Sequence, residues 1–400
     1  MIRFLTAGET HGPALTAIIE GFPAGMPLTA AAIQSDLDRR RQGYGRGGRM
    51  KIEGDRVEIL SGVRHGFTLG SPIAIRICNN DWARWCRVMA VEPGAGSDMV
   101  AIDADERIAA LRSEVTAPRP GHADLAGSLK YRQGDIRNIL ERASARETAA
   151  RVGVGAIARQ LLAAFDIEVD SGVIQIGTVS VGQVPGDHVE YRNLVRNSPV
   201  AAPDPDVSGR MMAEIDSARE HGDSLGGVIE VVARGVPVGL GSHVHWDRKL
   251  DARLSGALMS IPAIKAVEIG LGFAAAGRPG SDVHDEIFFN ERTGFYRKTN
   301  NAGGIEGGIS NGQPIRLRVA MKPIPTLYKP LQTVDLITKE PLSASVERSD
   351  TCAVPAAAVV AEAMTCWVLA EAFCEKFGGD HLDEMCENYR NYRSAVGTGQ

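Results

Sequence analysis

The sequence predicts an α+β fold, in which helices and strands do not alternate regularly along the chain. Four short segments carry β-branched residues or polar–apolar alternation with glycine nearby, at 57–60, 72–77, 227–233 and 315–321. Four longer segments have helical patterns, at 29–41, 145–165, 249–260 and 353–377. Regular strand–helix alternation would favour a doubly wound parallel sheet, so its absence favours an α+β arrangement.

The composition is that of a globular protein with many tight turns. Of 400 residues, 44% are apolar, 23% are charged and 45 are glycine. By length alone the chain has room for two or three domains, but no low-complexity linker or repeat divides it. The formal net charge of −5 argues against a general affinity for nucleic acid or for anionic membranes.

The cysteines and the apolar segments indicate a cytoplasmic protein. None of the six cysteines has C-x-x-C spacing, and the chain begins without a basic-then-apolar signal, so reduced thiols are expected. The most apolar stretch, 353–372, is interrupted by Glu362 and Glu371. It predicts a buried or amphipathic helix rather than a membrane span.

Five arginines interleaved with glycines between positions 39 and 49 form the most unusual segment of the chain. From Asp36 to Lys51, six basic residues stand against two acidic ones. Guanidinium groups bind phosphate and carboxylate oxygens in pairs, and glycine lets backbone approach a ligand closely. The segment therefore predicts an anionic ligand, and we expect it to form a mobile loop that closes over that ligand.

The residues of this segment also match two other sequence motifs. Residues 43–48 match G-x-G-x-x-G, but a polar sequence precedes them instead of the apolar strand that a dinucleotide fingerprint requires. The segment also resembles an RGG-type RNA-binding run. A non-catalytic phosphate- or RNA-binding protein therefore stays open as an alternative.

A helix start at 144–147 offers a second anion site. Ser144 and Glu147 fit a capping box, with Ser144 as the N-cap. Free amides and the helix dipole favour an anion at such an end, and Arg142 and Arg146 flank it. The alternative is a capped surface helix with two solvated arginines.

Several histidines and one aspartate are candidates for acid–base chemistry. His11 and His122 stand among glycine and proline, outside any apolar periodicity, and Arg119 accompanies His122. Asp350 precedes the last long helix and is either functional or simply its cap. His243 and His245, with Asp247, have the alternation of ligands on a strand, but without a clear fourth ligand we expect no metal there.

Taken together, these segments closely resemble the chorismate synthase family over nearly the whole chain. The resemblance is carried by many motifs in one order, at 8–12, 39–50, 119–124, 142–148, 222–227, 250–254, 263–270 and 300–312. It implies a single domain over 1–400, with a β-α-β sandwich of long helices packed between antiparallel sheets.

The resemblance also implies an activity. Members of the family are lyases that convert 5-enolpyruvylshikimate 3-phosphate to chorismate by anti-1,4-elimination of phosphate, the last step of the shikimate pathway. They require reduced FMN without net redox change, with NADPH serving indirectly through an external flavin reductase. They are homo-oligomers, usually tetramers, and bind no nucleic acid or membrane. A flavin oxidoreductase with net electron transfer is a further alternative.

Site residues follow from the motif positions. The resemblance implies that the anions of the substrate are bound by five arginines, Arg40, Arg46, Arg49, Arg119 and Arg146. It also implies that a nicotinamide nucleotide contacts Arg40 and Arg46. It gives the flavin to Arg142, Ala143, Ser144, Pro262, Ala263, Gly307, Lys322, Pro323, Ile324, Pro325, Thr326 and Arg348. It implies that His11 protonates the departing phosphate, that His122 stabilises the reduced flavin, and that Asp350 accepts a proton from the flavin.

Overall fold

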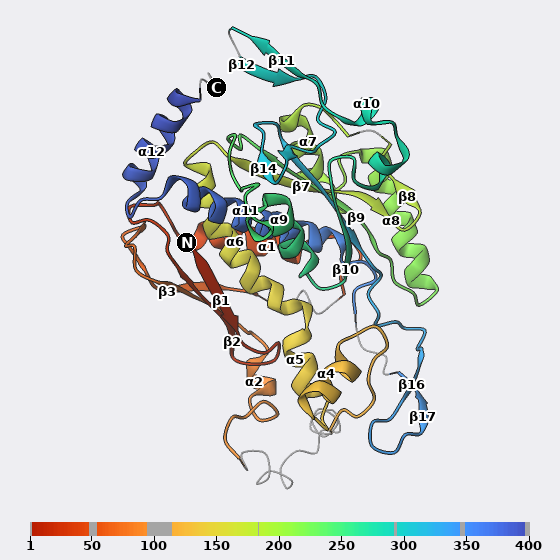
Figure 1. Ribbon diagram of the computed structural model, residues 1–400. Coiled ribbons are helices and arrows are strands. Elements are labelled where there is room, and N and C mark those ends of the chain that lie inside the picture. Colours follow the sequence, from red (N-terminus) through yellow and green to blue (C-terminus); the bar gives the residue numbers. More distant parts are fainter. Residues whose placement is uncertain are drawn as a thin grey trace.

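Two antiparallel sheets enclose a layer of three long helices in the computed structural model of the protein (Figure 1). The structure describes residues 2–47, 54–93, 114–182, 184–291, 294–344 and 349–396. The predicted Arg49 and Arg348 fall outside these ranges. The α+β prediction is confirmed, and so is the placement of long helices between sheets.

The first sheet has four strands in the order β1-β2-β6-β3. They are β1 (Arg3–Ala7), β2 (Ala14–Glu20), β6 (Ile73–Cys78) and β3 (Val57–Ser61), all paired antiparallel. In β6 the alternation of the sequence decides the faces: Ile73, Ile75 and Ile77 are buried against the helices while Arg76 is exposed. This sheet therefore covers one side of the helical layer.

The second sheet has five strands in the order β10-β15-β9-β7-β8. They are β10 (Ile264–Ile269), β15 (Ile315–Met321), β9 (Gly227–Arg234), β7 (Glu168–Ile176) and β8 (Val179–Ser180). Helix α11 contacts β7, β9 and β15, so this sheet covers the opposite side of the layer.

The helical layer consists of α1 (Ala30–Arg41), α6 (Thr148–Ala163) and α11 (Val354–Phe377). Helices α6 and α11 approach so closely that a Cβ on Gly155 would lie 2.4 Å from that of Ala363. Among the described helices, α11 is the one long and apolar enough by length and composition to cross a membrane, and 89% of its most apolar stretch is buried inside the molecule. It is hydrophobic on all sides because it is surrounded by the core.

A buried ion cluster joins the three helices. Glu362 of α11 is 1% exposed, and its carboxylate accepts hydrogen bonds from Arg39 of α1, Arg159 of α6 and Ser171 of β7. Burial alone would raise the pKa of Glu362, but the charges of Arg159 and Arg39 outweigh it and lower that pKa to about 2. The carboxylate is therefore ionised throughout the working range.

Smaller elements surround the sandwich. Three two-stranded pairs are β4 (Val63–Arg64) with β5 (Phe67–Thr68), β13 (Ile305–Glu306) with β14 (Ile309–Ser310), and β16 (Gln332–Val334) with β17 (Pro341–Ser343). The other helices are α2 (Trp82–Trp85), α4 (Asp124–Tyr131), α5 (Arg137–Ala143), α7 (His188–Asn197), α8 (Pro205–Glu220), α9 (Leu250–Met259), α10 (Gly280–Val283) and α12 (Leu382–Ala395). The described ranges also contain the short 3-10 turns η3 (Ala145–Glu147), η4 (Trp246–Arg248) and η5 (Gly272–Gly277).

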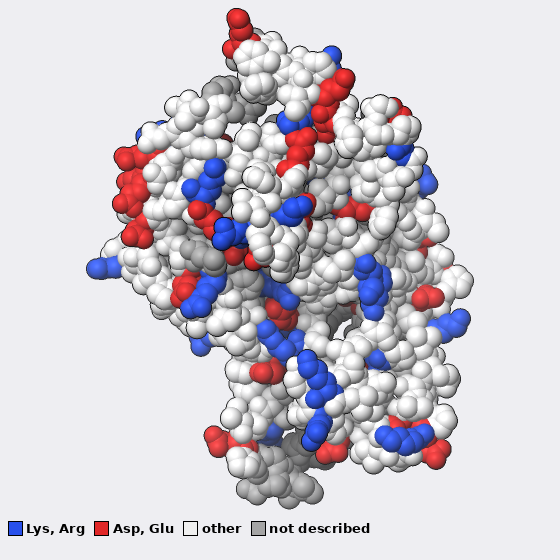
Figure 2. All heavy atoms as spheres, in the orientation of Figure 1, with Lys and Arg blue, Asp and Glu red and all other residues white. Residues whose placement is uncertain are grey.

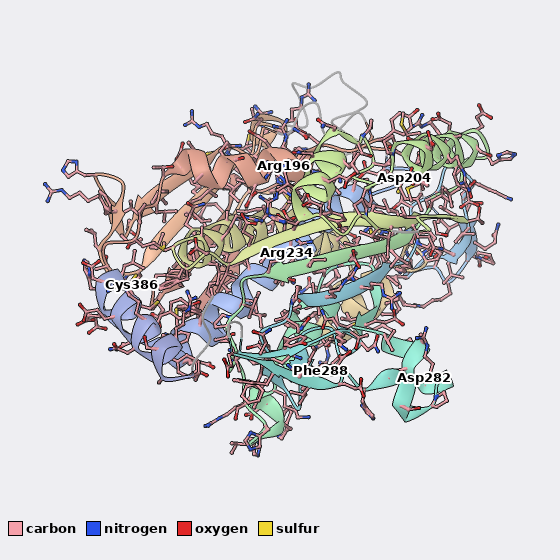
Figure 3. The ribbon with its side chains drawn as sticks, turned by 90° about the horizontal axis from the view of Figure 1, so that it is seen from above. Arg196, Asp204, Arg234, Asp282, Phe288 and Cys386 are labelled. Atoms are coloured by element: carbon pink, nitrogen blue, oxygen red, sulfur yellow. The ribbon has the colours of Figure 1, made fainter. Side chains whose placement is uncertain are left out.

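A fourth pair forms a hairpin that projects from the body, β11 (Ile287–Asn290) with β12 (Gly294–Arg297) (Figure 1). Seen from above, the hairpin with Phe288 lies outside the sheet whose strand β9 ends at Arg234 (Figure 3). At the opposite end of the molecule, α4, α5 and the β16–β17 pair lie below the layers (Figure 1). At this lower end, α4 follows His122 in the chain and α5 carries Arg142 and Ala143.

The predicted elements are confirmed to within a few residues, but two local expectations are wrong and one alternative is excluded. The helix predicted at 29–41 is confirmed as α1, and its last turn contains Arg39–Arg41, which the loop expected at 39–49 wrongly included. The Ser144 hydroxyl accepts from Arg146 N, but Glu147 turns to Arg151 instead of completing a capping box. Asp350 does not cap α11, whose N-cap residue is Ala353.

Candidate active site

His11 is fixed by one buried carboxylate. It lies in the loop between β1 and β2, where Gly8 has a φ of +112° and a Cβ would lie 2.5 Å from Ala14 O. Glu141, near the end of α5, accepts from His11 N at 2.8 Å with Oε2 and lies 2.7 Å from His11 Nδ1 with Oε1. Glu141 is 2% exposed and His11 9%. Loop and helix are therefore locked together at the imidazole.

Asn79 and Trp85, which follow β6 in the chain, complete the surroundings of His11. The Trp85 ring of α2 stacks on the imidazole, with centroids 3.7 Å apart and planes inclined by 21°. Asn79 donates from Nδ2 to Gly12 O at 2.8 Å, which holds the loop from its other side. The Trp85 Nε1 donates to Asp81, so the stacking ring is itself fixed.

A buried aspartate joins two of the predicted anion-binding arginines. Asp55 is fully buried, with Oδ2 3.0 Å from Arg40 Nη1 and Oδ1 3.1 Å from Arg146 Nη2. Arg40 also donates to Thr148 Oγ1, and Arg146 donates to the backbone oxygen of Cys78, the neighbour of Asn79. The structure thus brings Arg40 and Arg146 together and places them next to the His11 loop.

Arg46 and Asp350 meet on the other side of the Arg/Gly segment. Arg46 Nε lies 3.2 Å from Asp350 Oδ2, and Gly47 N donates to Asp350 Oδ1 at 2.6 Å. Burial and the negative charge of Asp350 raise the pKa of the Cys352 thiol to about 11, so that thiol stays neutral. Tyr44 donates to Asp216, and Gly45 O accepts from Thr351 N, so residues 44–47 are held by hydrogen bonds.

His122 lies against the loop that follows β15. Its Nε2 is 3.3 Å from Thr326 Oγ1, and Lys322 Nζ donates to Gly121 O at 2.7 Å. Ser349 donates to Thr326 O at 2.9 Å, which connects this loop with the Asp350 segment. His122, the 322–326 loop and Asp350 therefore form one group, as the sequence motifs suggest.

The side chain of Arg119 is bound to a carboxylate, that of Asp124. Its guanidinium donates to both oxygens of Asp124, at 2.8 and 3.1 Å, and its backbone N donates to the same carboxylate at 3.0 Å. Asp124 is 1% exposed and begins α4, which packs on α5 through Gly127 and Ile139. This packing connects the His122 group with the helix that carries Glu141.

The predicted flavin residues separate into three places. Arg142, Ala143 and Ser144 end α5 beside Glu141, with Arg142 donating to Thr6 and to Gly8 O. Ala263, next to Pro262, accepts from Lys322 N at 2.9 Å and so belongs with the 322–326 loop. Gly307 lies beyond the start of β15 and Lys322 beyond its end, and a seven-residue strand spans roughly 20 Å. Within one chain, Gly307 is therefore separated from the 322–326 loop.

Charge on the visible face is mixed. Figure 2 shows basic and acidic side chains interspersed over this face, without one continuous basic surface. Arg39 and Arg40 bind carboxylates inside the chain. These internal pairs disfavour an RNA-binding surface built from the Arg/Gly segment.

Metal chemistry finds no support in the described ranges. They contain no group of three or more His, Cys, Asp or Glu residues arranged to hold a metal ion. His245 lies in an exposed bend, where its Nδ1 pairs with Asp247 at 2.8 Å. His243 and His245 therefore do not lie on a strand.

Sequence reasoning missed four residues of this site: Asp55, Asn79, Trp85 and Glu141. The contact between Glu141 and His11 joins positions 130 residues apart. No periodicity in the sequence indicates such a pair, and the motif at 142–148 begins one residue after Glu141 and so does not include it. Only the docking of α5 on the β1–β2 loop makes its role visible.

Comparisons with known proteins agree over the whole chain. The profile of the family described as chorismate synthase matches residues 2–374. A chorismate synthase of Desulforamulus reducens is 59% identical over 388 residues, covering 96% of both chains. One of Brevibacillus brevis is 56% identical, covering 98% of this chain and 99% of its own. A crystal structure of chorismate synthase superposes with a TM-score of 0.78 at 44% identity, covering 99% of this chain and 98% of the other.

Proposed function

The chain belongs to the chorismate synthase family, and from this premise we propose how its residues carry out the reaction. Enzymes of this family make chorismate in the shikimate pathway. We propose that the substrate is 5-enolpyruvylshikimate 3-phosphate and that the reaction is an anti-1,4-elimination of phosphate, a carbon–oxygen lyase step. The observation that carries the proposal is a carboxylate-fixed imidazole, His11, next to the buried Arg40–Asp55–Arg146 cluster.

The arginines would bind the anions of the substrate. This substrate carries one phosphate and two carboxylates, and planar guanidinium groups bind such oxygens in pairs. Asp55 holds Arg40 and Arg146 at 3.0 and 3.1 Å, and Asp350 does the same for Arg46 at 3.2 Å. Positions fixed before binding reduce the ordering cost that flexible side chains incur. Arg49 and Arg119 complete the proposed set.

His11 would protonate the phosphate as the carbon–oxygen bond breaks. Phosphate leaves more readily once one of its oxygens gains a proton, because less charge then develops on it. With Nδ1 turned to Glu141, the proton would be delivered from Nε2. The stacked Trp85 limits rotation of the ring and helps exclude water.

The donors around His122 suit a flavin mononucleotide. Lys322, His122 and Thr326 offer one cation, one imidazole and one hydroxyl, which match the phosphate and the carbonyl edge of FMN. Ser144, at the end of α5, would add a second hydroxyl. Arg142, Ala143, Pro262, Ala263, Pro323, Ile324, Pro325, Gly307 and Arg348 would complete the contacts. When bound and reduced, FMN supplies electron density that helps the allylic phosphate to leave.

Two side chains would manage protons and charge near the flavin. His122 would stabilise the negative charge of its reduced form, from a position fixed by Pro120 O and Thr326 Oγ1. Asp350 would accept a proton from the flavin, because its carboxylate is an acceptor held by Gly47 N and Arg46. We propose no net change of oxidation state.

The remaining expectations also belong to this proposal. Reduced flavin would come from an external reductase that uses NADPH, and the protein would work as a homotetramer in the cytoplasm. Six cysteines present as free thiols support a reducing compartment. One continuous hydrophobic core, from Ile2 to Tyr389, supports a single domain.

One anaerobic experiment tests the proposal. The protein is incubated with 5-enolpyruvylshikimate 3-phosphate and dithionite-reduced FMN, and phosphate and chorismate are measured. We expect both products in equal amounts, with turnover sharply reduced in His11→Ala and His122→Ala. Absence of product from the unaltered protein would overturn the activity. Near-full turnover by both variants would overturn the roles given to the histidines.

A further inference from the structure

Both carboxylate oxygens of Glu141 contact the same residue, His11. Oε2 accepts from the backbone N of His11 at 2.8 Å, and Oε1 lies 2.7 Å from its Nδ1. The backbone of Glu141 adds to this, because its O accepts from Thr10 N and from Thr10 Oγ1, both at 3.0 Å. Four hydrogen bonds thus fix the β1–β2 loop on the end of α5.

This arrangement decides which nitrogen of His11 carries a proton. A backbone N–H only donates, so Oε2 must accept, and an ionised carboxylate offers Oε1 as an acceptor as well. The ring must then donate from Nδ1, which leaves Nε2 as the nitrogen that exchanges a proton with the substrate. The same carboxylate pairs with the positive charge of the ring when both nitrogens are protonated.

Glu141 is held where it can do this. It is 2% exposed, and α5 is anchored on β1 through Arg142, which donates to Thr6 Oγ1 at 2.7 Å. Trp85 stacks at 3.7 Å and restricts rotation of the imidazole about its side-chain bonds. The ring is therefore constrained both in orientation and in tautomer.

We propose that Glu141 is the positioning residue of the reaction: it keeps the Nδ1 proton of His11 in place, so that Nε2 takes up a proton to give the doubly protonated ring and passes that proton to the departing phosphate. This inference rests on the proposed function, since it assigns Glu141 a role through the proton donor. Glu141 itself touches neither substrate nor cofactor in this role.

Glu141→Gln is the informative substitution because it keeps the size of the side chain. A glutamine has one acceptor oxygen where the carboxylate has two, so it cannot accept from both His11 N and His11 Nδ1. If its oxygen stays on the backbone N–H, its NH₂ group faces Nδ1 and forces the proton to Nε2. Glu141→Asp keeps the charge on a shorter arm and should restore part of the activity.

The test combines kinetics with a tautomer measurement. In the anaerobic assay we expect Glu141→Gln to lose about 10²-fold in kcat, within the 10²- to 10⁴-fold that a positioned acid–base group contributes. KM should change by less than about threefold, because the arginines stay in place. In a His11→Ala background the same substitution should cost less than about twofold, because its effect passes through His11.

The ¹⁵N NMR spectrum of histidine-labelled protein gives a readout independent of activity. With His11 assigned by comparison to His11→Ala, the neutral ring should carry its proton on Nδ1 in the unaltered protein and on Nε2 in Glu141→Gln. Glu230→Gln is the matched control, because Glu230 is also a buried carboxylate, paired with Arg316 on the second sheet.

The outcomes separate the two proposals. An Nε2–H ring in the unaltered protein, or near-full kcat in Glu141→Gln, would overturn the role of Glu141 while leaving the activity intact. An equal loss in Glu230→Gln would also overturn it, since that loss would reflect stability alone. No turnover by the unaltered protein would instead overturn the proposed function.

Discussion

Glu362→Gln should destabilise the protein by about 3 kcal/mol at neutral pH, because Glu362 is the shared carboxylate of the buried cluster. Its pKa is lowered from 4.5 to about 2, and a tenfold change in an ionisation constant corresponds to about 1.4 kcal/mol. Removal of one partner from a buried ion pair costs about 3–5 kcal/mol, so the two figures agree. Arg39 and Arg159 would remain half-buried, with Asp36 as the carboxylate that they still share.

The pH dependence has a definite sign. Because the pKa of Glu362 is lower in the folded protein than in the unfolded chain, its contribution is fully present above about 4.5. The contribution is lost as the pH falls through about 2. The difference in unfolding free energy between the unaltered protein and Glu362→Gln should therefore shrink as the solution is acidified from pH 5.

Urea unfolding followed by circular dichroism measures this difference, at neutral pH and at several acidic values. Glu371→Gln is the matched control, because Glu371 lies on the same helix and pairs with Arg253 at 2.7 Å, but its side chain is 23% exposed. We expect that control to lose less than about 1 kcal/mol. Equal losses in both variants, or a Glu362→Gln deficit that does not change with pH, would refute the reasoning.

Three further predictions concern other parts of the chain. Arg46→Ala should raise the KM for 5-enolpyruvylshikimate 3-phosphate more than the Kd of FMN, as measured by turnover and by flavin fluorescence; an equal change in both would contradict its assignment to the substrate. Gly155→Ala should cost about 1–3 kcal/mol in thermal unfolding, because its Cβ would lie 2.4 Å from Ala363 Cβ and 2.5 Å from Ala363 O; an unchanged thermal unfolding would count against that close approach of the two helices. Burial raises the pKa of Cys366 to about 12, so at pH 8 iodoacetamide should leave it unlabelled in the folded protein and label it after unfolding, as peptide mass spectrometry reports; rapid labelling of the native protein would show that the thiol is accessible.

The sequence was a good guide wherever a pattern is local. The helix at 353–377 is confirmed as α11 (Val354–Phe377), because continuous apolar character over that length needs a buried helix. The strand at 315–321 is confirmed as β15 because its alternation matches the pleat. The helical pattern at 29–41 correctly predicted the conformation of residues 39–41. Their charge wrongly suggested a ligand loop, because two of their partners, Glu362 and Asp55, cannot be recognised from the local sequence.

The candidate site shows the same division. His11, His122 and Asp350 stood out from the sequence because histidine and aspartate carry recognisable chemistry and sit among turn residues. Asp55 and Glu141 did not, because their roles consist entirely of contacts across the fold. Chemistry near a ligand can be predicted from residue type, while the residues that hold that chemistry in place depend on how distant segments dock.

The central position of α11 has a consequence for synthesis on the ribosome. Residues 354–377 are made after every strand of both sheets, yet the second sheet and the other two long helices pack against them, and Phe4 of the first sheet contacts Trp367. Translation adds about 5–20 residues per second, so the apolar faces of the two sheets that α11 later helps to cover remain exposed for many seconds before this helix emerges. Chaperone binding to the nascent chain should therefore be strongest just before α11 leaves the exit tunnel, and should fall once the helix enters its place.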